Sequence, residues 1–343
     1  MSTRAQAGTV PVIVISGHLG AGKTSLLNHL LREPGARLGV VINDFGAINV
    51  DAGLVTGQVD EAATISGGCL CCLPDSGGLD DALEQLSQPR LRMDAILVEA
   101  SGAADPIALT RIIRFCDVPG VRHGGLIEVV DAVEHFSTVD VEEEPPSRYA
   151  AATLVVIGKT DLLPEGEREE VTARIRERVR MRNPRAQIVV ADRGGIDPRL
   201  AFDASAEEDP VDELPIAELL REAAGAHEHR HAASAAVELP DAVAPGALAA
   251  LLKDPPAGAY RMKGRVRVRG PRSEQAYVVH VVGSMVHVAR LRQSPEPGEL
   301  VAIGMDLDVG DAERRLRELA DSAPAAPDPQ GLLRLQRLEG LSG

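Results

Sequence analysis

Residues 17–24, which read Gly-His-Leu-Gly-Ala-Gly-Lys-Thr, constrain the fold of this chain more than any other segment. They match the G-x-x-x-x-G-K-[S/T] pattern of a phosphate-binding loop, which is specific when a strand precedes it and a helix follows it. Both elements are expected, because residues 10–16 form an apolar run and residues 23–32 have the pattern of a helix. The segment therefore predicts a strand–loop–helix unit that holds nucleotide phosphates at a helix N-terminus.

The glycines of this loop let successive backbone N–H groups point toward phosphate oxygens. The residues expected to bind the nucleotide are Gly20, Ala21, Gly22, Lys23, Thr24 and Ser25. Within this set, Lys23 is expected to reach the β- and γ-phosphates, and the Thr24 hydroxyl is expected to bind Mg²⁺.

A carboxylate is expected beside this loop, at the end of a second apolar run. Residues 95–98 are apolar and lead into Glu99-Ala100-Ser101-Gly102. At a strand tip next to the loop, Glu99 is placed to hold Mg²⁺ through water, and Gly102 can contact the γ-phosphate. Alone the pattern is weak, because carboxylates at strand ends are often only solvated. The neighbouring phosphate-binding loop favours the functional interpretation.

The base-recognition motif is less clear. Gly158-Lys159-Thr160-Asp161 follows the apolar run 154–157, at the place where GTP-binding proteins carry Asn/Thr-Lys-x-Asp. Asp161 can accept hydrogen bonds from two guanine N–H donors, and the stem of Lys159 can cover the ring. Gly158 departs from the pattern and removes a side-chain contact. A plain surface turn is the alternative, so a strict preference for GTP over ATP stays open.

Three of the four cysteines fall within four positions, as Cys69, Cys71 and Cys72 after two glycines. Thiolates at this spacing can converge on one soft divalent metal ion if the chain turns. Three ligands leave a coordination position open, which suits a metal that is passed on. The alternative is a chance cluster of buried structural cysteines. Cys116 stands alone and is expected in the core.

Up to about residue 222, apolar runs alternate with segments of helical pattern. Further strands are expected at residues 38–42, 95–98, 126–130, 154–157 and 188–190, and helices at 79–86 and 165–181. The runs lack strict alternation, as is typical of parallel strands covered on both faces. Residues 1–222 therefore predict a doubly wound, mostly parallel α/β sheet.

A linker and a smaller domain are expected after this sheet. Residues 223–236 are rich in small residues and carry His227, His229 and His231, which can capture a metal loosely or form a solvated linker. Residues 237–343 are expected to form an α+β domain with an antiparallel sheet. Its basic stripe, five residues at alternate positions, predicts a solvated strand face, or a docking face for an acidic client or for the acidic loops of this chain. The stripe consists of Arg261, Lys263, Arg265, Arg267 and Arg269.

Charge and composition exclude several classes of protein. The formal net charge of −15 argues against general nucleic-acid binding, which needs a positive surface. Aromatic residues make up 2% of the chain, so stacking platforms for single strands are not expected. The start lacks the pattern of a signal peptide and no run is long enough to span a membrane. Clustered cysteines without a disulfide framework fit a reducing compartment, so the cytoplasm is the expected location.

Taken together and in this order, the motifs resemble the CobW-like family of metallochaperone GTPases, within the SIMIBI class of P-loop proteins. Besides the segments above, they include Asn43-Asp44-Phe45-Gly46 and the second-domain segment that begins at Tyr260. The resemblance implies metal ligands at Cys69, Cys71 and Cys72. The chain departs from the family at Asp44, which replaces Glu, and at Ala47, which replaces a common acid.

This resemblance implies a GTPase that delivers Zn²⁺, or otherwise Co²⁺ or Ni²⁺, to a client metalloenzyme that docks on the second domain. GTP and Mg²⁺ are the expected nucleotide and cofactor, and Lys23, Asp44 and Glu99 the expected catalytic residues, with Asp44 orienting water. A monomer or a dimer dependent on nucleotide or metal is expected. The alternatives are a metal buffer or sensor that holds nucleotide as a structural ligand, and a small-molecule P-loop kinase.

Overall fold

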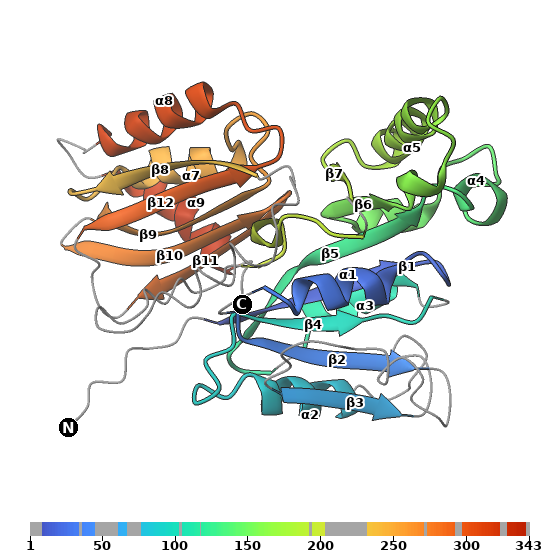
Figure 1. The fold of residues 1–343 in the computed structure, drawn as a ribbon. Coiled ribbons are helices and arrows are strands. Elements are labelled where there is room, and N and C mark those ends of the chain that lie inside the picture. The colour runs from blue at the N-terminus through green and yellow to red at the C-terminus, as the bar shows by residue number, and fades with distance from the viewer. Residues whose placement is uncertain are drawn as a thin grey trace, which may run out of the picture. The chain divides into compact units, whose positions relative to one another are not determined.

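The computed structural model describes residues 9–33, 36–44, 61–66, 77–102, 105–116, 118–191, 194–202, 232–270, 273–291, 297–322 and 328–340. Side chains at residues 42–44, 61–66, 77–78 and 340 are not described. The chain divides into two compact units, one within Thr9–His229 and one within Arg230–Gly343 (Figure 1). Most of the predicted linker, residues 223–236, lies outside the described residues, so its bounds stay a prediction.

The first unit is built on a seven-stranded sheet in the order β3-β2-β4-β1-β5-β6-β7. All its strand pairings are parallel. The strands are β1 (Val10–Gly17), β2 (Leu38–Asp44), β3 (Glu61–Ser66), β4 (Ala95–Glu99), β5 (Val121–Asp131), β6 (Leu154–Gly158) and β7 (Gln187–Val190). The predicted doubly wound α/β sheet is therefore confirmed.

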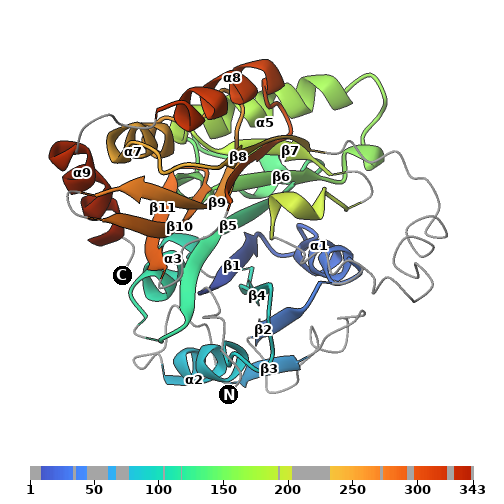
Figure 2. The ribbon, with the colours of Figure 1, turned by 90° about the vertical axis from the view of Figure 1, so that its left-hand side faces the viewer.

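Helices cover both faces of this sheet (Figure 2). They are α1 (Lys23–Leu30), α2 (Gly77–Leu86), α3 (Pro106–Arg114), α4 (His135–Thr138) and α5 (Arg168–Arg182). Apolar side chains of α2, α3 and α5 share one core cluster with alternate residues of the central strands, and α1 lies on the opposite face. Because parallel strands run in one direction, the loops that leave their carboxyl ends lie along one edge of the sheet.

The second unit carries a five-stranded antiparallel sheet in the order β11-β10-β9-β12-β8. Its strands are β8 (Ala233–Leu239), β9 (Arg261–Arg269), β10 (Glu274–Val282), β11 (Met285–Leu291) and β12 (Gly298–Gly304). Helices α7 (Pro245–Lys253), α8 (Val309–Ala320) and α9 (Pro329–Gly340) pack through apolar side chains on one core with this sheet. This confirms the expected smaller α+β domain.

The basic stripe follows β9, and not all of its residues are solvated, because Arg261 is buried and the Arg267 side chain is only 13% exposed. Arg265 and Arg269 are exposed, as predicted, whereas Arg261 is only 3% exposed. Arg261 lies directly across from Val282 of β10 and Ile303 of β12, both of which are buried. Long arginine stems pack along apolar neighbours of this kind. The predicted solvated face is therefore wrong for Arg261.

Within the described residues, no helix is both long and apolar enough to cross a membrane.

Candidate nucleotide site

The loop between β1 and α1 has the backbone that a phosphate-binding loop needs. Gly20 and Gly22 have φ of 78° and 102°, in the left-handed region that favours glycine. Gly17 has φ 153°, and a Cβ there would lie 2.6 Å from the carbonyl oxygen of Val129. These positions accept no side chain without strain, which explains why the sequence carries glycine at each of them.

Three predicted side chains meet at the end of this loop. The Lys23 ammonium donates to the carbonyl oxygens of Gly17 at 3.2 Å and His18 at 3.3 Å, so it lies against the loop. The Thr24 hydroxyl donates to Oε1 of Glu99 at 2.8 Å. Glu99 ends β4, beside Ile15 of β1, and is only 3% exposed. Hydroxyl and carboxylate oxygens are the ligands that Mg²⁺ prefers, so this pair fits the predicted magnesium site.

The glycine after Glu99 lies directly against the phosphate-binding loop. A Cβ added at Gly102 would stand 2.6 Å from the backbone nitrogen of Leu19 and 2.8 Å from its Cα. Only a residue without a side chain allows this approach. The two loops that flank the predicted γ-phosphate position are therefore in direct backbone contact.

The predicted base-recognition motif begins at the carboxyl end of β6. Gly158 is buried, and Lys159 has a left-handed backbone with φ 59°. The Lys159 ammonium lies 2.6 Å from Oδ2 of Asp131, the last residue of β5. Asp161 is exposed, and its backbone carbonyl accepts from Arg168 at 3.1 Å. The structure thus adds Asp131 to the residues that sequence reasoning assigned to this motif.

The loop after β7 contacts α1, the helix that follows the phosphate-binding loop. The ring nitrogen Nε2 of His29 lies 2.7 Å from the carbonyl oxygen of Ile196. A Cβ added at Gly194 would meet Ser25, an exposed residue in the first turn of α1, at 3.6 Å. The loops after β6 and β7 therefore leave the same edge of the sheet as the phosphate-binding loop, and the second of them contacts α1.

A buried ion pair lies beside Ser16, directly before the phosphate-binding loop. Nε of Arg148 lies 2.6 Å from Oε1 of Glu128, which is 2% exposed and is the β5 partner of Ser16. Burial raises the pKa of the Glu128 carboxyl, and the positive charge of Arg148 opposes this shift. The predicted residue set omitted both members of this pair.

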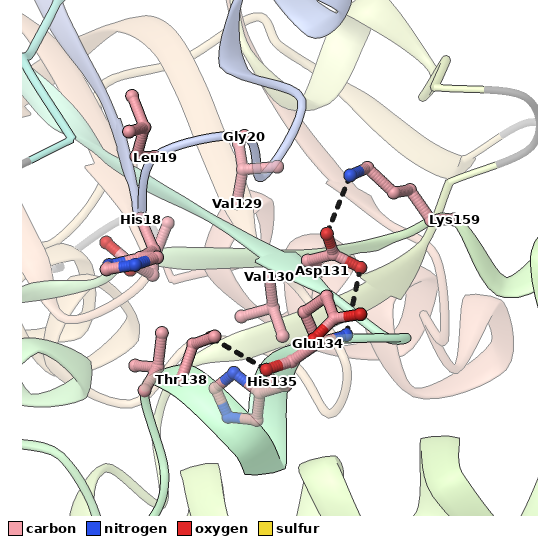
Figure 3. Close-up of a pocket in the computed structure, with 12 residues that line it drawn as sticks. His18, Leu19, Gly20, Val129, Val130, Asp131, Glu134, His135, Thr138 and Lys159 are labelled. Atoms are coloured by element: carbon pink, nitrogen blue, oxygen red, sulfur yellow. Dashed lines mark hydrogen bonds and ion pairs between the residues drawn. The ribbon is translucent and has the colours of Figure 1, made fainter.

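A cavity of about 300 Å³ lies beside residues His18, Leu19 and Gly20 of the loop (Figure 3). It is lined by His18 and Gly20 from the loop, by Glu128 and Asp131 from β5, and by His135 and Lys159. The carboxylates of Glu128 and Asp131 and the ammonium of Lys159 lie in this lining among apolar neighbours such as Val129 and Val130. The cavity connects the phosphate-binding loop to the base-recognition motif.

Several predicted site residues lie outside this description. Cys69, Cys71 and Cys72, and the linker residues His227, His229 and His231, are outside the described residues. Asn43 and Asp44 belong to β2 by their backbone, but their side chains are not described. In the part of the chain that the structure describes, no three or more His, Cys, Asp or Glu side chains gather to hold a metal ion. The proposed ligands therefore stay predictions.

Cys116 lies just after α3, where it is half-buried and packs against the core cluster of the first unit. Its Sγ donates to the carbonyl oxygen of Ile113 at 3.1 Å. This position agrees with the expected structural role.

Comparisons with known proteins assign both units. The family model described as CobW/HypB/UreG, nucleotide-binding domain, matches residues 11–190, more than half of the chain. The model described as cobalamin synthesis protein cobW C-terminal domain matches residues 232–320.

Similar individual proteins carry zinc-related names. The zinc chaperone YjiA of Escherichia coli is 31% identical over 57% of this chain and 62% of its own length. The zinc chaperone CobW of a Sinorhizobium species is 28% identical over 83% of this chain and 88% of its own length. A solved structure of Zn(II)-bound YjiA GTPase from E. coli aligns with 91% of this chain and 99% of its own, at 22% identity and a TM-score of 0.43. From its two family matches, this chain belongs to the CobW/HypB/UreG family of nucleotide-binding proteins.

Proposed function

We propose that this protein is a GTP-hydrolysing metallochaperone. It binds Zn²⁺, or otherwise Co²⁺ or Ni²⁺, through Cys69, Cys71 and Cys72 and delivers the metal to a client metalloprotein. The relatives named zinc chaperone support the metal and the role. A further relative, 29% identical over 55% of this chain, is named zinc-regulated GTPase metalloprotein activator 1, from Schizosaccharomyces pombe, which supports the nucleotide chemistry.

The observation that carries this proposal is the order of strands along the functional edge. β3, β2, β4 and β1 are consecutive in the sheet, and each ends at that edge. Neighbouring strands lie about 4.8 Å apart, so β3 is about 10 Å from β4, the strand that ends in Glu99. Cys69 follows Ser66, the end of β3, by three residues, which span at most about 11 Å. The cysteine motif is thus tethered within reach of the nucleotide site.

The nucleotide chemistry follows from the residues at the loop. Lys23 binds the β- and γ-phosphates, and Thr24 together with Glu99 holds Mg²⁺, which neutralises phosphate charge when bound. Asp44 ends β2, two residues after Ile42, the register partner of Glu99, and we propose that its carboxylate orients the attacking water. Water attacks the γ-phosphorus, the bond to the β-phosphate oxygen breaks, and GDP and inorganic phosphate leave. We expect slow hydrolysis, as in switch proteins to which no arginine has been supplied.

Metal delivery depends on coupling between the two sites. If the cysteine segment senses whether the γ-phosphate is present, then nucleotide changes metal affinity. Linkage requires that the metal changes nucleotide affinity by the same factor. The thiolates must be deprotonated to bind metal, so metal affinity rises with pH.

The test is a zinc titration of the full chain against a chromophoric chelator, with GDP and with a non-hydrolysable GTP analogue. We expect the zinc affinity to differ at least about tenfold between the two nucleotide states, which corresponds to a coupling of about 1.4 kcal/mol. Cys71→Ser should abolish the difference while nucleotide binding persists. Cys116→Ser is the matched control, because it removes a thiol that lies outside the motif.

Other outcomes identify the alternatives. Hydrolysis that proceeds at one rate with and without Zn²⁺ or Co²⁺, with metal retained through turnover, would indicate a buffer or sensor. Transfer of the γ-phosphate to a small acceptor would indicate a kinase. Equal affinity for zinc in both nucleotide states would contradict the delivery mechanism.

A further inference from the structure

The base-recognition motif contains a strained residue that something must hold in place. Among the described non-glycine residues, only Arg92 and Lys159 have φ in the left-handed region. A residue with a side chain persists in that conformation only when its surroundings hold it. Lys159 is also the residue whose stem is expected to cover the purine ring. The question is which contact fixes it.

Asp131 supplies that contact from the neighbouring strand. Its Oδ2 lies 2.6 Å from the Lys159 ammonium, and the Lys159 and Asp131 side chains are 36% and 13% exposed. Its Oδ1 accepts from the backbone nitrogen of Val133 at 2.9 Å and of Glu134 at 3.3 Å. One oxygen therefore holds the carboxylate in the turn after β5, and the other holds Lys159 (Figure 3).

The backbone joins the same two loops. The nitrogen of Ala132 donates to the carbonyl oxygen of Gly158 at 3.0 Å, and the nitrogen of Leu162 donates to that of Lys159 at 3.1 Å. Gly158 stands where related motifs carry Asn or Thr, so it offers no side chain to steady the loop. The ion pair between Asp131, at the end of β5, and Lys159, after β6, holds the loop in its place; we call this ion pair the clamp.

We infer that Asp131 is a positioning residue that sets the preference of this site for guanine. It holds the 158–161 loop so that the Lys159 stem covers the ring and the Asp161 carboxylate faces the two guanine N–H donors. Asp131 itself touches no nucleotide. The inference rests on the proposed function, because it assumes that the natural ligand is a guanine nucleoside triphosphate.

Replacement of Asp131 by asparagine isolates the clamp. The amide side chain of Asp131→Asn would keep an oxygen for the turn after β5, so the start of α4 is preserved, but the substitution removes the charge that holds Lys159. The experiment measures the binding of GTP, ITP and ATP to the wild type and to Asp131→Asn, and the KM and kcat of GTP hydrolysis. ITP lacks the 2-amino group, so the GTP-to-ITP affinity ratio reports the contact with Asp161.

We expect the KM for GTP to rise about fivefold, the upper end for a partly exposed ion pair, with kcat changed less than about twofold. The GTP-to-ITP ratio should fall by a similar factor. Glu165→Gln is the matched control, because it removes an exposed carboxylate shortly after the same motif and outside the cavity.

Lys159→Met is the second variant, and it decides the case if Asp131→Asn fails to fold. It keeps the stem over the ring and removes the ammonium, so it should lower the GTP-to-ITP ratio as Asp131→Asn does. The double variant should be no worse than either single variant, because both break the same contact. Asp131→Glu should restore part of the ratio.

The outcomes separate this inference from the proposed function. If the wild type does not prefer GTP over ATP, the proposed GTPase function fails whatever the variants do. If the wild type prefers GTP and Asp131→Asn weakens all three nucleotides equally, or none of them, the positioning role is refuted and the GTPase function stands. An unchanged ratio in Lys159→Met also overturns the inference.

Discussion

Glu99 accepts a hydrogen bond from the Thr24 hydroxyl, and we expect the affinity of the site for Mg²⁺ to depend on this carboxylate. A threonine hydroxyl has one proton, and here it is donated to Glu99 at 2.8 Å. Because the proton is used in that bond, the oxygen lone pairs of Thr24 would remain free to bind Mg²⁺. Glu99→Gln keeps the shape but removes the charge, and its amide can turn an N–H toward the hydroxyl.

Loss of such a supporting partner typically weakens metal affinity about 10- to 100-fold. This range corresponds to about 1.4–2.7 kcal/mol. Solvent screens the interaction little, because Glu99 is only 3% exposed. We therefore expect the Mg²⁺ concentration for half-maximal GTP hydrolysis to rise by one to two orders of magnitude in Glu99→Gln. Binding of GTP without Mg²⁺ should persist, because Lys23 and the loop backbone are intact.

The assay is a Mg²⁺ titration of single-turnover GTP hydrolysis, with binding of a fluorescent GTP analogue followed in parallel. Glu84→Gln is the control, because Glu84 is an exposed acid on α2. An unchanged Mg²⁺ midpoint would refute the reasoning. Loss of GTP binding in the absence of Mg²⁺ would show instead that Glu99 supports the loop itself.

Three further predictions concern the first unit. Gly102→Ala should weaken nucleotide binding at least about tenfold, because the added Cβ would stand 2.6 Å from the backbone of the phosphate-binding loop. Gly166→Ala is the control, since its Cβ would meet nothing within 4 Å, and the nucleotide affinity measured by calorimetry should not change. Arg178→Met should lower the free energy of unfolding by about 3–5 kcal/mol, because it leaves the fully buried carboxylate of Asp140 without its ion-pair partner. A thermal melt should show Tm lowered by about 6–20 °C, and adding Asp140→Asn should recover most of this loss. Burial lowers the pKa of His135 to about 4, below its ordinary 6.5, so the unfolded chain binds more protons between these values and stability falls as pH drops through this window. Urea unfolding from pH 7 to pH 4 should show a loss of about 3 kcal/mol that His135→Gln largely removes, and an equal slope in both proteins would contradict this cause.

The strands of the first sheet were predictable because their chemistry is local. Residues 10–16, 95–98 and 154–157 are short apolar runs with buried positions on both faces, and all three became parallel strands. β3, at the edge of the sheet, was not predicted, because Ile65 is the one large apolar residue of Glu61–Ser66. α3 was expected only as an apolar helical stretch before Cys116, without bounds, although Asp105 caps it and Pro106 begins it, which is a recognised start signal.

In the candidate site, too, the residues that belong to a local motif were predictable and those that depend on the order of the strands were not. Lys23 and Thr24 are encoded by spacing within one motif, so sequence alone assigned them. Glu99 needed only a strand end beside that motif. Asp131 and the pair of Glu128 with Arg148 depend on β5 lying between β1 and β6, which no local pattern reveals. A carboxylate that ends an apolar strand, as Asp131 does, was the one available signal.

The backbone contact between Gly102 and Leu19 has a mechanical consequence. Two chain segments this close have no side chain between them to absorb a displacement. Gly102 shortly precedes Asp105, whose carboxylate accepts from Ile107 and fixes the first turn of α3. A displacement of Leu19 would therefore act directly on the backbone at Gly102, shortly before α3, a helix on the opposite side of the sheet from α1.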